Sequence, residues 1–182
     1  GEPLTRHLAL QPNTRIEHML SDENERYYLI GSNQAYGFII KFEDLLTSFK
    51  NGKAVISLKK NHEILKPDGI DNIKTDMVLA VSNMGRILIF PLKQLPYLKK
   101  GQGNKIIAIP QKDRDASPPE LLKFLKTLPQ RSNILIYSGK HKLNLSPGNQ
   151  KDYRGMRGQR GKKLPKPFTL IDQVDIIMKD EK

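Results

Sequence analysis

The most constraining feature of the sequence is a hairpin pattern that recurs along the chain. Residues 29–42 and 79–90 each place a Ser-Asn turn and a glycine between two apolar, β-prone runs, and residues 134–145 form a looser copy. Such runs on both sides of a short turn are typical of antiparallel β-hairpins. The chain is therefore predicted to be all-β, with one hairpin type repeated.

A glycine opens a further strand-like run after each hairpin. The glycines of this kind, Gly1, Gly52, Gly103 and Gly161, are 51, 51 and 58 residues apart. Any all-β domain contains hairpins, so chance resemblance is the alternative. The joint recurrence of turn, strand and glycine favours a true repeat, and a period of about 50 residues is typical of propeller blades. We expect a single domain of about three blades of four-stranded antiparallel sheet, spanning roughly residues 1–51, 52–102 and 103–182.

Length and composition narrow the class of protein. The 182 residues are enough for one domain core, and the absence of cysteine excludes disulfides and cysteine-ligated zinc. No apolar run approaches the roughly 20 residues of a membrane-spanning helix, and no signal peptide opens the chain. Because the sequence begins with Gly1 in the middle of the repeat pattern, we expect it to be a fragment of a longer protein.

The sequence carries a large excess of positive charge. Against 19 Asp and Glu stand 31 Lys and Arg, which leaves a net charge of +12. Such an excess favours a polyanionic partner, because each phosphate that a cation neutralises releases counterions. The alternative is that the basic surface only keeps the domain soluble.

Several segments outside the hairpins have predictable local structure. The segment at 117–126 resembles a helix start, yet the repeat frame favours a strand over residues 122–128. Residues 43–52 read as a short helical turn closed by a glycine. Strands are further expected at residues 4–10, 16–19 and 174–178.

The segment at 148–166 is the most informative single stretch, because it holds seven cations and one anion and so contributes +6 to the net charge. Its glycines free the backbone to follow a phosphate chain, and its arginines are suited to bidentate phosphate contacts. The alternative is a disordered basic linker. Nothing in it resembles a base-reading element, so we expect contacts with the nucleic-acid backbone. The cations predicted to bind DNA here are Arg154, Arg157, Arg160, Lys162 and Lys163.

Further lysines recur where one blade meets the next and on the third hairpin. If the blades surround an axis, equivalent joints fall on one rim and give DNA a positive track. The alternative is that these lysines are only solvated loop residues. They are Lys50, Lys53, Lys99, Lys100, Lys105, Lys140 and Lys142.

Signatures of catalysis are missing from the sequence. It contains no Walker loop, and Gly101-Gln102-Gly103 lacks the third glycine of a dinucleotide fingerprint. The four histidines stand far apart, without metal-ligand spacing. We therefore expect no active site, no metal and no cofactor in this chain.

Stretches spread over nearly the whole chain carry a family likeness. They are residues 1–5, 16–20, 36–38, 85–92, 95–96 and 100–107. The last, Lys-Gly-Gln-Gly-Asn-Lys-Ile-Ile, is the most specific. Together they resemble the C-terminal domain of bacterial type IIA topoisomerase A subunits, and that of topoisomerase IV more closely than that of gyrase.

The resemblance implies a β-pinwheel, a propeller variant in which neighbouring blades exchange a strand, and a role in binding and bending duplex DNA on its outer rim. It implies a parent ATP-dependent type II topoisomerase that needs ATP and Mg²⁺, both bound elsewhere. The family's catalytic tyrosine would lie outside this chain, whose tyrosines match no such motif. The implied partners are duplex DNA, the rest of the A subunit, and the ATPase-bearing B subunit, in the bacterial cytoplasm at the nucleoid, without a membrane. The implied role is to steer DNA segments for decatenation and supercoil relaxation.

One departure from the gyrase pattern matters. Gyrase carries a Gln-Arg-Arg-Gly-Gly-Lys-Gly box that is tied to tight wrapping, whereas the nearest match here, residues 159–163, lacks the second arginine and two glycines. We therefore expect DNA capture with modest bending. Two alternatives stay open: a propeller that serves as a protein-interaction scaffold, and RNA binding through the basic segment at 148–166, called the Arg-Gly segment below.

Overall fold

The computed structural model describes residues 14–21 and 26–178. Its regular secondary structure consists mainly of short β-strands, joined by loops and a few single-turn helices. The strands are β1 (Tyr27–Gly31), β2 (Tyr36–Lys41), β3 (Asp68–Ile70), β4 (Met77–Ser82), β5 (Arg86–Pro91), β6 (Asn104–Lys105), β7 (Leu122–Leu128), β8 (Asn133–Ser138), β9 (His141–Leu145), β10 (Lys162–Lys163) and β11 (Gln173–Ile177). The helices are the 3₁₀ turns η2 (Phe42–Leu45), η3 (Leu92–Gln94) and η4 (Asn149–Tyr153), and α1 (Gln111–Arg114).

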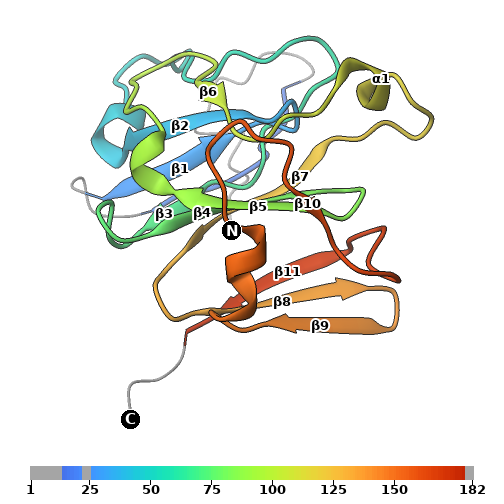
Figure 1. Ribbon diagram of the computed structural model, residues 1–182. Helices are drawn as coiled ribbons and strands as arrows, with labels where there is room; N and C mark the ends of the chain where they lie inside the picture. The colour runs from blue at the N-terminus through green and yellow to red at the C-terminus, as the bar shows by residue number, and fades with distance from the viewer. Residues whose placement is uncertain (1–13, 22–25, 179–182) are drawn as a thin grey trace, which may run out of the picture.

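The strands form three antiparallel sheets that lie in successive layers (Figure 1). The first sheet has the order β3-β1-β2-β6, the second β10-β5-β4-β7 and the third β11-β8-β9. The predicted hairpins β1-β2 and β4-β5 form the centres of the first two sheets, and the predicted hairpin β8-β9 forms two of the three strands of the third. The prediction of an all-β fold with about three blades is confirmed, although the third sheet has three strands in the described part of the chain.

Neighbouring repeats exchange strands. The strand that leads into each later hairpin pairs with the preceding one, β3 with β1 and β7 with β4. The strand that follows a later hairpin does the same on the other edge, β6 with β2 and β10 with β5. Each complete sheet therefore combines segments from both sides of the predicted boundaries near residues 51 and 102. The boundaries near residues 51 and 102 separate repeats in the sequence. That they also separate blades stays a prediction.

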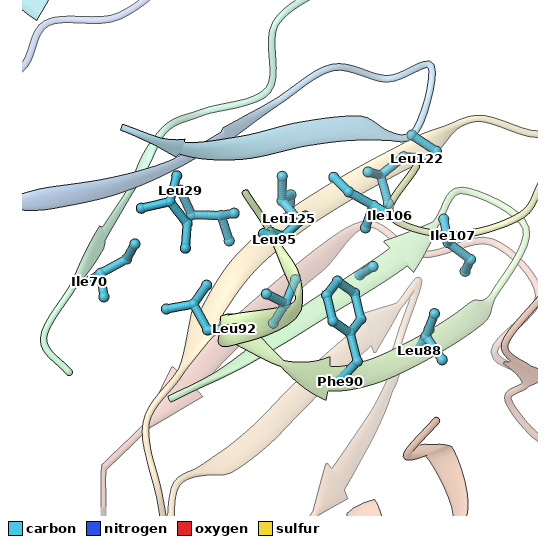
Figure 2. Close-up of a cluster of buried hydrophobic side chains, with 14 of the residues drawn as sticks. Leu29, Ile70, Leu88, Phe90, Leu92, Leu95, Ile106, Ile107, Leu122 and Leu125 are labelled. Atoms are coloured by element: carbon cyan, nitrogen blue, oxygen red, sulfur yellow. The ribbon is translucent and has the colours of Figure 1, made fainter. Parts of the chain in front are cut away.

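The hydrophobic core lies between the sheets. Val78 and Ala80 of β4 face the first sheet, whereas Leu79 and Val81 face the third. Because β4 is buried on both faces, its sequence is a continuous apolar run rather than an alternating one. Figure 2 shows Phe90 of β5 among the side chains between the first and second sheets, where it is fully buried. Truncation of such a phenylalanine to alanine costs about 3–5 kcal/mol.

Two glycines of the predicted repeat permit the strand exchange. Gly103 and Gly161 have φ angles of 79° and 71°, which residues with a Cβ atom rarely adopt. A Cβ at Gly103 would lie 2.2 Å from the carbonyl oxygen of Gly37, and one at Gly161 would lie 2.7 Å from that of Ile87. Each glycine thus lets the chain meet the preceding hairpin closely enough for β6 or β10 to pair with it.

The other local predictions had mixed outcomes. The strand at residues 122–128 is confirmed as β7, and the final strand is confirmed as β11. The helical turn expected at residues 43–52 is shorter, and only η2 forms. The strand expected at residues 16–19 is wrong, because no described strand lies beside this segment to supply ladder hydrogen bonds. The strand expected at residues 4–10 lies outside the described residues.

Candidate nucleic-acid interface

One edge of the successive sheets collects most of the predicted cations. Beyond β2, the chain at Tyr97 runs alongside Ile39 and continues into β6. Beyond β5, the chain at Arg154 runs alongside Ile89 and continues into β10 in the same way. In the third sheet, β9, the counterpart of β2 and β5, is itself the edge strand among the described residues. We call this surface the basic edge; its cations are Lys99, Lys100, Lys105, Lys140, Lys142, Arg154, Arg157, Lys162 and Lys163.

Lys50 and Lys53 come from a separate segment that approaches the same edge. The amide nitrogen of Gly101 lies 2.9 Å from the carbonyl oxygen of Val55, and that of Ser57 lies 3.0 Å from the carbonyl oxygen of Gly101. The chain after Lys53 therefore lies beside the loop that carries Lys99 and Lys100. The sequence predicted that these lysines lie on one rim, but it did not predict which segments lie side by side. Backbone hydrogen bonds between distant segments determine that.

Most of these cations are exposed and have no protein partner. Their side chains make no hydrogen bond or ion pair with the described residues, so their charge is available to an external anion. This group comprises Lys50, Lys100, Lys105, Lys140, Arg154, Lys162 and Lys163. Lys53 is also exposed, and its charge acts on the Asp44 carboxylate. Lys142 is also exposed, and its ammonium lies 5.6 Å from the centre of the Tyr137 ring.

Lys99 is partly neutralised by a small polar cluster. Its ammonium lies 3.1 Å from a carboxylate oxygen of Asp44. The Tyr97 hydroxyl donates a hydrogen bond to the same carboxylate. This bond, with a smaller contribution from burial, raises the pKa of Tyr97 to about 12. The hydrogen bond from Tyr97, together with Lys99, holds the pKa of Asp44 below its ordinary value, although desolvation acts in the opposite direction.

Arg157 joins the two loops of the basic edge. Its amide nitrogen donates to Oε1 of Gln94 at 2.8 Å, and its Nη1 donates to the carbonyl oxygen of Lys105 at 2.8 Å. The neighbouring amide of Gly158 donates to the carbonyl oxygen of Ile106, also at 2.8 Å. The Arg-Gly segment therefore follows a defined course, fixed against the loop that carries β6.

The glycines of this segment serve packing as well as turning. A Cβ at Gly155 would lie 2.4 Å from Oε1 of Gln159 and 3.0 Å from a methyl of Leu88. Gly161 is constrained by Ile87, as described above, whereas a Cβ at Gly158 would meet only the Lys105 carbonyl, at 3.9 Å. Gly155 and Gly161 therefore allow the chain to pass close to β5. From the sequence, these glycines were expected to let the backbone follow a phosphate chain.

Arg160 is held by carboxylates of the protein itself. Its guanidinium donates to both carboxylate oxygens of Glu120, to Asp113 at 2.9 Å and to the carbonyl oxygen of Ala108 at 3.2 Å. These contacts use both terminal nitrogens, so the geometry assigns Arg160 a structural part. Its prediction as a phosphate ligand stays untested, and its donors are already engaged by protein acceptors.

Glu120 is the buried centre of this ion-pair network. Burial by itself would raise the pKa of the Glu120 carboxyl, but hydrogen bonds from Arg160 and Ser82 and the charges of Arg160 and Arg86 outweigh it. The pKa therefore lies below its ordinary value, and Glu120 is ionised at neutral pH. Ser82 begins the β4-β5 turn, and its hydroxyl donates a hydrogen bond to the Glu120 carboxylate at 2.8 Å.

Comparison with known proteins places this geometry in a family. No protein-family model matches the chain. The solved structure of the Escherichia coli ParC C-terminal domain matches with a TM-score of 0.89 and 38% identity, over 98% of this chain and 71% of that one. This chain belongs to the family of topoisomerase IV A subunits. It corresponds to the C-terminal domain of that family, and its fold is a β-pinwheel, as the resemblance implied.

Full-length relatives of this family extend well beyond the matched region. The A subunit of topoisomerase 4 from Haemophilus influenzae is 43% identical over 180 residues, which cover 97% of this chain and 23% of that protein. The chain thus spans about a quarter of the length of the curated relatives that it matches. The gyrase A C-terminal domain shares the fold at a TM-score of 0.72 and 16% identity, over 98% of this chain and 59% of that one.

Proposed function

We propose that this domain binds duplex DNA without sequence preference through the basic edge. The observation that carries the proposal is the position of exposed cations without protein partners on the same edge of three successive sheets. A stepped row of such charges can follow a curved phosphate backbone, and each contact releases counterions. No described helix is longer than the five residues of η4, which is too short for a helix that reads base edges in the major groove, and this supports recognition of the backbone alone.

Within the longer protein, the domain would hold DNA segments for a topoisomerase IV. In this proposal the domain bends the DNA modestly and thereby influences which crossings the enzyme passes. Strand cleavage by a tyrosine, ATP hydrolysis and the associated Mg²⁺ belong to the remainder of the parent protein or to its ATPase partner, and this chain uses no cofactor of its own. The site of action would be the bacterial nucleoid, and the described residues contain no helix that could span a membrane.

The decisive test is the affinity for a random-sequence duplex at several salt concentrations. We expect log K to fall linearly with log salt, with a slope of about −0.9 for each phosphate contacted. Charge reversal at Lys162 and Lys163 should weaken binding and flatten that slope. Reversal at Lys66 and Lys126, which lie just before β3 and on β7, at the opposite edges of the first and second sheets, is the control.

Three results would contradict the proposal. Equal loss of affinity in the control variant would mean that net charge, rather than the edge, attracts DNA. Tighter binding of single-stranded RNA than of duplex DNA would favour RNA binding through the Arg-Gly segment. Absence of DNA binding together with stable capture of the remaining part of the parent protein would favour a protein scaffold.

A further inference from the structure

A pocket of about 300 Å³ lies between the second and third sheets, at the ends of the strands away from the β4-β5 turn. Met77 and Leu128 of the second sheet form one wall, and Gln150 of η4 belongs to the other. Two arginines, Arg131 and Arg154, also line it. None of the lining residues carries a carboxylate, so the pocket is positively charged.

The segments that bear the two arginines are fastened to each other. Arg131 occupies a tight turn between β7 and β8, where its φ is 62°, and Arg154 follows directly after η4. The buried amide of Gln150 donates to the carbonyl oxygen of Ser132 at 2.7 Å and to that of Leu145 at 3.0 Å. A single buried side chain therefore ties η4 to the turn that carries Arg131, and this tie pre-organises the pocket.

Neither arginine side chain makes a hydrogen bond or ion pair with a described residue. This distinguishes the pocket from its neighbour lined by Arg86, Arg160 and Lys163, in which Asp113 and Glu120 oppose any anion. Guanidinium groups bind phosphate in a planar, bidentate manner. Two of them at a pocket without carboxylates are well matched to one phosphate group.

We propose that Arg131 and Arg154 together bind a backbone phosphate of DNA in this pocket. The proposal rests on the proposed function, and it extends the DNA path from β10 along β5. Arg154 lies beside Ile89 of β5, and Lys162 pairs with Ile87 of the same strand. Arg131 was not among the cations predicted from the sequence to bind DNA, because only the tertiary fold brings its turn to the pocket that Arg154 also lines.

The test compares Arg131→Ala, Arg154→Ala and the double variant with the intact 182-residue chain in duplex binding over a range of salt. Each single substitution should weaken binding roughly three- to tenfold at low salt and reduce the salt slope by up to about 1. The double variant should lose less than the product of the two single losses, because both guanidiniums hold one phosphate. Lys66→Ala, just before β3 at the opposite edge of the first sheet, is the control, and circular dichroism verifies folding.

Charge-conserving variants separate geometry from charge. Arg131→Lys and Arg154→Lys should keep most of the salt slope but lose affinity, because lysine cannot make the bidentate contact. A second probe, pyrophosphate, distinguishes a DNA phosphate from a free one. If pyrophosphate binding depended on both arginines while DNA binding did not, the assignment to the DNA backbone would be overturned.

The outcomes for this pocket and for the basic edge can be told apart. Unchanged affinity and slope in the arginine variants, with loss in the Lys162 and Lys163 variant, would overturn the pocket and leave the proposed function standing. Unchanged DNA binding in both sets would overturn both proposals. Strictly multiplicative losses at Arg131 and Arg154 would contradict a shared phosphate.

Discussion

The Arg160 guanidinium and the Glu120 carboxylate form an ion pair between segments that are 40 residues apart, with Nη1 and Oε1 separated by 3.1 Å. Glu120 lies just before β7, a strand of the second sheet, and Arg160 just before β10 at the opposite edge of that sheet. The Ser82 hydroxyl, in the turn between β4 and β5, joins the same carboxylate. The pair thus fixes the Arg-Gly segment to the sheet beside which it runs.

Removal of the Glu120 charge should destabilise the fold. The Glu120 side chain is only 6% exposed, so Glu120→Gln leaves Arg160 and Arg86 without their central anion. Loss of one partner from a buried pair costs about 3–5 kcal/mol, and we expect about 2 kcal/mol here because the arginines reach solvent. Urea unfolding measures the effect. Glu63→Gln, at an exposed site, should change the free energy of unfolding by less than about 0.5 kcal/mol, and an equal effect of the two variants would contradict the assignment.

The same carboxyl should make stability depend on pH at the acid side. Because the pKa of Glu120 in the folded state lies below its ordinary value of 4.5, the ionised form stabilises the fold above that value, and this contribution is lost as pH falls through the folded pKa. The stability difference between wild type and Glu120→Gln should be constant near neutral pH and shrink below about pH 4.5. Unfolding at a series of pH values tests this, and a difference that grows on acidification would refute it.

The repeat glycines should differ in their tolerance of alanine. Gly52 and Gly103 both have positive φ, 72° and 79°, but a Cβ at Gly52 would meet nothing within 4 Å. Gly52→Ala should therefore cost only the left-handed strain of about 1–2 kcal/mol. Gly103→Ala adds a clash with the Gly37 carbonyl and should cost clearly more and expose β6 to hydrogen exchange. Equal losses of stability in the two variants would show that the close approach does not matter.

Neighbouring cations of the Arg-Gly segment should separate into structural and DNA-binding groups. Arg160→Ala should lower the free energy of unfolding, because it leaves Glu120 buried without its main partner. Lys163→Ala should leave stability within about 0.5 kcal/mol of wild type and reduce DNA affinity, because its side chain is exposed and has no partner among the described residues. Denaturation and duplex binding of both variants check the distinction. Loss of stability in Lys163→Ala, with loss of DNA affinity alone in Arg160→Ala, would contradict this assignment of roles.

The Tyr97 hydroxyl should titrate at a higher pH than the hydroxyl of an ordinary tyrosine. Its hydrogen bond to Asp44 raises the pKa of Tyr97 to about 12, from 10.0. Asp44→Asn removes the nearby negative charge, so the phenolate forms more readily and the pKa should return toward its ordinary value. Near-ultraviolet absorbance titration of this variant, with Tyr97→Phe to identify the signal, provides the measurement. A titration curve unchanged by Asp44→Asn would exclude the proposed cause.

The hairpins could be predicted because their information is local. The turn at Ser82 and the apolar runs on either side of it are contiguous, and strand pairing across a tight turn follows from them. The two-residue strands β6 and β10 are too short to show a period, yet the glycines before them, Gly103 and Gly161, marked their positions. The expected strand at residues 16–19 failed because a strand also needs a partner, which the local pattern does not supply.

The sequence by itself determined the all-β repeat, the placement of its glycines and the excess of positive charge. Family resemblance added the pinwheel and the exchange of strands between blades. Only the tertiary structure decided which cations are available. Arg160 and Lys163 stand three positions apart, yet one faces Glu120 and Asp113 and the other faces solvent. Charge is a property of each residue, whereas its neutralisation depends on partners that the fold brings from 40 or more residues away.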